Sequence, residues 1–208
     1  AIHPDNPEYA SAVEKGIPML TRAQLLGQIM RNYDTPIAVS GTHGKTTTTS
    51  MISQILLEAD ADPTISVGGI LPSIGGNIRV GQSETFVTEA CEYTNSFLSF
   101  FPKISVILNI DADHLDFFKD IDDIRHSFRR FAQLLPADGA LIINADTPHY
   151  QDIIKDLSCK IITYGLEHEA QYQATDITYD KYGHASFTVL KDGRKAGSFY
   201  LKVPGSHN

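Results

Sequence analysis

The sequence predicts an α/β fold, in which a mostly parallel sheet is flanked by helices, carries a phosphate-binding loop and continues into a small antiparallel meander. Short apolar runs alternate with helical patterns from residue 35 to residue 165, an order typical of a parallel sheet covered on both faces. From residue 172 onward, strand patterns follow one another across short turns, which indicates antiparallel pairing. In sheets of the first kind, ligands bind beyond the carboxyl ends of the strands.

The elements of the parallel sheet are expected where apolar runs and helical spacing occur. The strands are expected at 37–39, 85–88, 105–108, 141–143 and 160–163. The helices are expected near 46–59, 122–135 and 147–157. In the second of these helical patterns, one face carries Ile121, Ile124, Phe128 and Phe131, which is typical of a helix packed on a core.

The two ends of the chain differ from this central region. Residues 1–33 predict two short helices: Asn6 caps the first, and a capping box at 21–24 opens the second. Taken alone, they indicate a peripheral helical hairpin without a function of its own. At the other end, the meander strands are expected at 174–179, 185–190 and 197–203, and we expect their role to be structural.

Composition and charge exclude several classes of protein. The net charge of −8 argues against broad nucleic-acid binding, which needs a basic face, although a local loop can still bind phosphate. No apolar stretch approaches the roughly 18–20 residues that span a bilayer. Cys91 and Cys159 match no metal-ligand spacing and favour a reducing compartment, although two cysteines do not exclude one disulfide. We therefore expect no nucleic-acid partner and no membrane partner.

The strongest local signal is the glycine-rich stretch after the first apolar run. This stretch reads Ser40-Gly41-Thr42-His43-Gly44-Lys45-Thr46-Thr47, and a helical pattern follows it directly. Glycines let backbone N–H groups turn toward phosphate oxygens, while Lys45 can reach the β- and γ-phosphates and the Thr46 hydroxyl can bind Mg²⁺. The strict form of the loop has glycine where Val39 stands, and Gly-Lys-Thr alone often occurs by chance. The strand before, the helix after and the glycine at 41 nevertheless favour nucleotide binding.

Carboxylates and a histidine follow two further apolar runs. Glu89 and Glu92 come after the run at 85–88, where either can supply an oxygen ligand to Mg²⁺ or can be a solvated carboxylate at a helix start. His114 lies among three aspartates in Asn109-Ile110-Asp111-Ala112-Asp113-His114-Leu115-Asp116, directly after the run at 105–108. An imidazole in that setting can bind a metal or act as an acid–base group. We expect Glu89 and His114 to converge near the phosphate loop, with Glu92 as the alternative ligand.

Asn144 and Asp146 follow the apolar run at 141–143. Asparagine can hydrogen-bond the edge of adenine, and aspartate can accept a ribose hydroxyl. An Asx turn that caps the next helix explains the same residues equally well. Both interpretations stay open at this point.

Together these motifs resemble those of the Mur ligases, which build the peptide of peptidoglycan precursors. The resemblance covers essentially the whole chain and rests on four stretches: 41–49, Glu89-Ala90-Cys91-Glu92-Tyr93, 109–114 and Pro204-Gly205-Ser206-His207-Asn208. It is closest to the branch that adds L-alanine. The helix expected at 122–131 lacks the lysine that several other branches carry there, which favours the same branch.

The resemblance implies a cytoplasmic enzyme of three domains. Residues 1–33 would be the end of a UDP-binding domain, residues 34–208 would be the central ATP-binding domain, and an amino-acid domain would follow. ATP would phosphorylate the carboxylate of UDP-N-acetylmuramate, and L-alanine would then attack the acyl phosphate. We therefore expect this chain by itself to bind ATP without catalysing ligation.

The resemblance also implies a set of site residues. The ATP-binding residues would be Gly41, Thr42, His43, Gly44, Lys45, Thr46, Thr47, Asn144 and Asp146. Lys45 and His114 would be catalytic. One Mg²⁺ would be held by Thr46 and Glu89, and a second by His114. The alternatives are a murein-peptide ligase, a ligase similar to folylpolyglutamate synthase, or an ATP-binding module that is inactive by itself.

Overall fold

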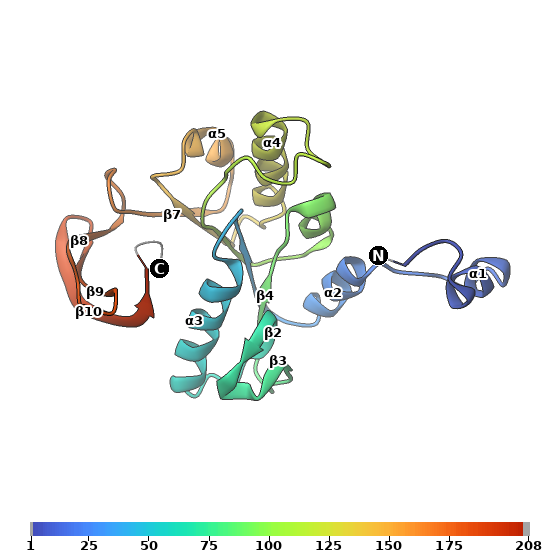
Figure 1. The fold of residues 1–208 in the computed structure, drawn as a ribbon. Coiled ribbons are helices and arrows are strands. Elements are labelled where there is room, and N and C mark those ends of the chain that lie inside the picture. Colours follow the sequence, from blue (N-terminus) through green and yellow to red (C-terminus); the bar gives the residue numbers. More distant parts are fainter. Residues whose placement is uncertain (1, 206–208) are drawn as a thin grey trace.

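A computed structural model describes residues 2–205 and contains one ten-stranded sheet with helices packed on it (Figure 1). The strand order across the sheet is β10-β9-β8-β7-β6-β5-β1-β4-β2-β3. The strands from β2 across to β8 pair in parallel, whereas β3 at one edge and β9 and β10 at the other pair antiparallel. The α/β fold with a C-terminal meander is therefore confirmed.

The strands that apolar patterns predicted lie close to their expected positions. The strands of the sheet are β1 (Thr35–Ser40), β2 (Thr64–Leu71), β3 (Gly76–Arg79), β4 (Thr85–Glu89), β5 (Ile104–Ile107), β6 (Ala140–Asn144), β7 (Lys160–Gly165), β8 (Tyr172–Tyr179), β9 (His184–Lys191) and β10 (Arg194–Pro204). The helices are α1 (Pro7–Glu14), α2 (Arg22–Met30), α3 (Lys45–Glu58), α4 (Ile121–Ala132) and α5 (Tyr150–Ile154), with 3₁₀ segments η1 (Pro72–Ile74) and η2 (Tyr93–Ser99).

Two strands were missed from sequence. β2 carries Gly68 and Gly69 in its interior, and these residues interrupt the apolar run that marks a strand. β3 has four residues and lies at the edge of the sheet, so its sequence carries little periodicity. Helix α5 is also shorter than the predicted 147–157, because His149 adopts a left-handed φ of 63° and the helix begins after it.

Helix α4 packs on the core through the face that its helical spacing predicted. Asp120 caps it by accepting hydrogen bonds from the N–H groups of residues 122 and 123, and one face is buried. Phe128 and Phe131 on that face contact Phe97 of η2: the Phe97 and Phe131 rings stack with centroids 4.6 Å apart, and Phe128 meets Phe97 edge-on at 5.4 Å. The predicted amphipathic pattern is therefore the pattern of the core.

The N-terminal helices differ from each other in how they pack. Both predicted caps are present, with Asn6 capping α1 and a capping box at Thr21 opening α2. Helix α2 buries Gly27 and Met30 and packs against η2. Helix α1 buries no residue, and Figure 1 shows it at the far end of an extended segment, not packed beside α2 as a compact hairpin.

The carboxyl ends of β1, β4, β5 and β6 meet at one edge of the sheet, because these strands are parallel and lie close to one another. Every motif that sequence analysis singled out follows one of these ends, except the terminal motif, whose residues 206–208 lie outside the described part of the chain. Cys91 and Cys159 are both free thiols. No described helix has the length and apolar character needed to cross a membrane.

Candidate active site

The loop between β1 and α3 is held in shape by two glycines. Gly41 has a φ of 144° and Gly44 a φ of 81°, conformations that residues with side chains rarely adopt. A Cβ atom on Gly41 would lie 2.9 Å from the Cβ atom of Leu108, so a side chain does not fit there. Helix α3 then begins at Lys45 without a side-chain cap. Its free N–H groups and positive dipole end, which include the first-turn residue Thr47, are therefore available to an anion.

Asn109 and Asp111, from the predicted histidine motif, brace this loop. The side-chain oxygen of Asn109 accepts a hydrogen bond from the His43 N–H at 2.8 Å, and its amide group donates to the His43 carbonyl oxygen at 3.1 Å. The Asp111 N–H donates to the Thr42 hydroxyl at 2.9 Å. The motif therefore positions the phosphate loop as well as carrying His114. Sequence reasoning missed this bracing role.

The ammonium group of Lys45 is already surrounded by oxygen atoms. Its Nζ atom donates to the carbonyl oxygens of Gly41 and Thr42 at 2.6 and 3.1 Å. It also donates to both carboxylate oxygens of Glu92, at 3.1 and 2.9 Å. The side chain of Glu92 is 3% exposed and that of Lys45 is 17% exposed, so the carboxylate of this ion pair is almost completely withdrawn from water. Sequence analysis considered Glu92 as an alternative metal ligand or as a solvated carboxylate, and not as the partner of Lys45.

Glu89, at the end of β4, reaches Thr46 in the first turn of α3. The Thr46 hydroxyl donates to Oε2 of Glu89 at 3.0 Å, and the Gly68 N–H donates to Oε1. A Cβ atom on Gly68 would lie 2.9 Å from Oε2 of Glu89, so the glycine in β2 makes room for the carboxylate.

These oxygens suit a hard cation. A carboxylate and a hydroxyl beside a phosphate loop are ligands that Mg²⁺ prefers, so Thr46 and Glu89 fit that metal. Within residues 2–205, no three His, Cys, Asp or Glu side chains are grouped so as to hold a metal ion. A cation at this place would therefore need phosphate oxygens and water to complete its coordination.

His114 lies next to Glu92, the residue that pairs with Lys45 of the loop. Its backbone is left-handed, with a φ of 52°, and its ring lies against Tyr93 with centroids 4.5 Å apart. Its Nε2 atom lies 3.9 Å from Oε1 of Glu92. The Tyr93 hydroxyl donates to Asp116 at 2.7 Å, and this hydrogen bond raises the pKa of Tyr93.

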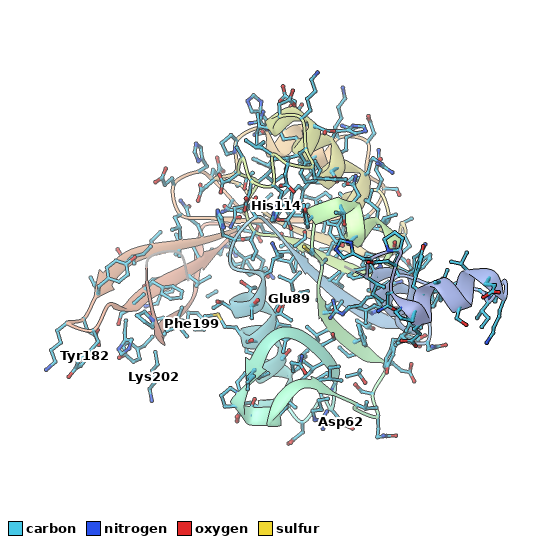
Figure 2. All side chains as sticks on the ribbon, turned by 45° about the vertical axis from the view of Figure 1, so that its right-hand side comes forward. Asp62, Glu89, His114, Tyr182, Phe199 and Lys202 are labelled. Atoms are coloured by element: carbon cyan, nitrogen blue, oxygen red, sulfur yellow. The ribbon has the colours of Figure 1, made fainter. Side chains whose placement is uncertain are left out.

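The predicted site residues thus gather around the loop, although not all in direct contact. Glu89 contacts Thr46, whereas His114 lies next to Glu92, the partner of Lys45. Figure 2 shows Glu89 and His114 in the middle of the molecule and Tyr182, Phe199 and Lys202 out on the meander. The metal-binding roles of Glu89 and His114 stay predictions.

A pocket of about 630 Å³ extends from the loop to the meander. Its polar side includes His43, Gly44, Asn109, Asn144 and Asp146. Its apolar side includes Tyr164, Leu166, Ile177, Ala185, Phe187 and Val189. A pocket with one apolar side and a few polar groups, next to a phosphate loop, has the character expected for a nucleoside site. Side chains of the meander, for which we expected a structural role, line this pocket.

Asn144 and Asp146 lie on this pocket, but both have partners within the protein. The Asn144 side-chain oxygen accepts from the Asp146 N–H at 2.9 Å, so the Asx turn is present. It does not cap the next helix as expected, because α5 begins only at Tyr150 and has no side-chain cap. The Asp146 carboxylate accepts hydrogen bonds from the N–H groups of Leu166, Glu167 and His168, and its Oδ1 lies 2.9 Å from Nδ1 of His168. Their contacts with adenine and ribose stay predictions.

Burial and hydrogen bonding shift the pKa values of two groups on the pocket, Asp146 and Tyr164. Burial alone would raise the pKa of Asp146, but the hydrogen bonds from the turn at 166–168 together outweigh it, so the pKa is lowered. Burial, with the nearby Asp146 charge, raises the pKa of Tyr164 well above its usual range. Sequence analysis did not predict the pocket residues at 164–166 or in the meander, because they carry no local motif.

Comparisons with known proteins agree with this geometry. Residues 39–208 match the family model described as the Mur ligase middle domain. The chain is 60% identical over 209 aligned residues to a UDP-N-acetylmuramate–L-alanine ligase of Lachnospira eligens, and 62% identical over 208 residues to one of Agathobacter rectalis. The matches cover 100% of this chain but 46% and 45% of those proteins, so the chain spans about half the length of these relatives.

Solved structures give the same result. A UDP-N-acetylmuramate–alanine ligase of Thermotoga maritima is 27% identical with a TM-score of 0.84, and the match covers 100% of this chain and 46% of that one. A UDP-N-acetylmuramate:L-alanyl-γ-D-glutamyl-meso-diaminopimelate ligase of Neisseria meningitides is 28% identical with a TM-score of 0.85, covering 99% and 67%. The fold, the loop and these matches together show that the chain belongs to the Mur ligase family, whose middle-domain model matches residues 39–208.

Proposed function

We propose that this chain is the ATP-binding part of a cytoplasmic enzyme that joins L-alanine to UDP-N-acetylmuramate through an acyl phosphate. The observation that carries the proposal is the loop from Gly41 to Thr47. It leads into a helix without a side-chain cap, and the Lys45 ammonium group lies against the backbone of the loop. The sequence relatives at 60% and 62% identity, named as L-alanine ligases, favour this reaction. Residues 1–33 would then belong to a UDP-binding domain and residues 34–208 to the ATP-binding domain.

In this proposal the loop binds and orients the phosphates. Lys45 and the N–H groups at the start of α3 neutralise the charge that develops on the γ-phosphoryl group as it is transferred to the carboxylate of UDP-N-acetylmuramate. Mg²⁺, held by Thr46 and Glu89 with a second ion near His114, would supply further positive charge at the phosphate oxygens. The nucleoside would lie in the pocket between Asn144 and the meander.

Ligation is best tested in a chimera, because the chain covers 46% of the Lachnospira eligens relative. Residues 1–208 would replace the matching segment of that enzyme. We expect phosphate release that depends on ATP, UDP-N-acetylmuramate and L-alanine together, and its loss in the chimera with Lys45→Ala. The chain by itself should release no phosphate in the same assay. A chimera that folds and binds ATP but ligates nothing would contradict the proposed reaction.

The structural similarity to the ligase of Neisseria meningitides makes a murein-peptide ligase the second candidate. The two reactions share UDP-N-acetylmuramate and differ in the second substrate. In the chimera, the grafted amino-acid domain would itself select the second substrate. The assay that separates the two reactions therefore needs the natural protein that contains this chain. Turnover with L-alanine supports the first proposal, whereas turnover with L-alanyl-γ-D-glutamyl-meso-diaminopimelate alone supports the second.

A further inference from the structure

The hydrogen-bonding capacity of Lys45 is fully used within the protein. An ammonium group has three N–H donors. Four oxygen atoms lie within 3.1 Å of Nζ: the carbonyl oxygens of Gly41 and Thr42 and the two carboxylate oxygens of Glu92. A phosphate oxygen that binds Lys45 must therefore displace or weaken at least one of these contacts.

Glu92 is the acceptor that a phosphate opposes most strongly. The Gly41 and Thr42 carbonyls are uncharged and are part of the loop backbone, whereas Glu92 carries a full negative charge and is 3% exposed. Two anions close to one ammonium group repel each other, and this repulsion is weakly screened where water is excluded. Loss of the ammonium would leave the Glu92 carboxylate buried, with the His114 ring nitrogen 3.9 Å away as a neighbour.

A divalent cation on the phosphates changes this balance. Metal-free ATP brings only negative charge to a loop that already has the Glu92 carboxylate on Lys45 and the Glu89 carboxylate on Thr46. ATP that carries its cation brings compensating positive charge to the same place. The same two carboxylates therefore disfavour one form of the nucleotide and tolerate the other.

We propose that Glu92 competes with the nucleotide phosphates for Lys45, and thereby makes the loop select nucleotide that carries a divalent cation over metal-free nucleotide. Glu92 is in this sense a specificity-determining residue that acts on the phosphates through Lys45. The inference rests on the proposed function to the extent that the loop must bind ATP.

The test compares ATP affinity with excess Mg²⁺ and with EDTA in three proteins: the natural chain, Glu92→Gln and Glu84→Gln. Glu84 is an exposed carboxylate just before β4, at the end of that strand remote from the loop, and serves as the matched control. In Glu92→Gln we expect metal-free ATP to bind at least about tenfold tighter than in the natural chain, and the affinity for Mg-ATP to change by less than about threefold. In Glu84→Gln neither affinity should change.

The outcomes separate this inference from the simpler view that Glu92 only holds Lys45 in place. If Glu92 only holds Lys45 in place, Glu92→Gln should lower the affinity for Mg-ATP and the affinity for metal-free ATP equally. Such a result, or no change in either affinity, would overturn the inference. Thermal unfolding checks that the variant is folded, and Glu92→Met, which is also uncharged and similar in length, replaces it if it is not. If the natural chain binds neither form, or Lys45→Ala binds ATP as well as the natural chain, the proposed nucleotide site itself is wrong.

Discussion

The two ends of the candidate nucleotide site are built in different ways. At the phosphate end, charged and polar side chains from the start of α3 and from the end of β4 already contact one another: Lys45 with Glu92, and Thr46 with Glu89. At the nucleoside end, the pocket is lined mainly by apolar side chains of the meander, such as Ile177, Phe187 and Val189. If the proposed function holds, the first end would bind phosphates by exchanging ionic partners, whereas the second would bind the nucleoside by removing apolar surface from water.

This contrast has a consequence for binding. Contacts at the phosphate end should respond to charge, to divalent cations and to salt, since they are ionic. Contacts at the nucleoside end should depend much less on divalent cations and on ionic strength, since they are apolar. Substitutions at the two ends should therefore separate the affinity for ATP from the affinity for adenosine, which has no phosphates.

The largest expected effect is that of Lys45→Ala. The dissociation constant for Mg-ATP should rise at least about 100-fold, which corresponds to about 2.7 kcal/mol, while adenosine binding should not change. The variant should also be about 3 kcal/mol less stable, because the Glu92 carboxylate is left buried without its partner. Calorimetry and urea unfolding measure the two effects.

Lys103→Ala is the matched control for Lys45→Ala. Lys103 also forms an ion pair, with Asp138, but that carboxylate is 77% exposed and lies away from the loop. Both ATP affinity and stability should stay close to those of the natural chain. If Lys45→Ala binds Mg-ATP normally, the phosphate end does not bind as described.

Val189→Asp should have the next largest effect and should act on the nucleoside end. A carboxylate on the apolar side of the pocket must lose water when a base enters, so ATP, ADP and adenosine should all bind about tenfold more weakly, with or without Mg²⁺. Ser186→Asp places the same charge in β9 on an exposed residue outside the pocket lining and should leave all three affinities unchanged. Equal loss of affinity in both variants would mean that the added charge disturbs strand β9 and does not act within the pocket.

Asp146→Asn should have the smallest effect, mainly on stability. The carboxylate of Asp146 holds the turn at 166–168, and its pKa lies below the ordinary value of 3.8. A lowered pKa in the folded state means that the ionised group stabilises the fold above pH 3.8, and that this stabilisation is lost as the pH falls from 3.8 toward the folded-state pKa. Asp146→Asn should therefore be about 1–2 kcal/mol less stable at pH 7.

The pH dependence distinguishes this role from a general packing defect. The difference in unfolding free energy between Asp146→Asn and the natural chain should shrink below pH 3.8. Asp152→Asn, which changes a carboxylate that is 74% exposed on α5, should show no such difference at any pH. A constant deficit for Asp146→Asn across the pH range would contradict the role of the ionised carboxylate.

The sequence by itself determined the parts of the site whose geometry is local. Gly41 and Gly44 are needed because the chain must turn with positive φ within a few residues of a strand end, and that requirement is visible in a short motif. The face of α4 that packs on Phe97 was likewise visible as helical spacing. The gathering of Glu89 and His114 at the loop followed from the rule that parallel strands end at a common edge.

Tertiary structure alone decided which of these groups meet. Strand β1 lies between β4 and β5 in the sheet, so Lys45 faces Glu92 across 47 positions of sequence, and Asn109 braces His43 across 66. The apolar side of the pocket exists because β8 pairs with β7 and carries the meander around to the site. Periodicity reports which face of an element is buried, but it says nothing about strand order or about what lies opposite that face. The partners of Lys45 and the lining of the pocket therefore became visible only in the folded chain.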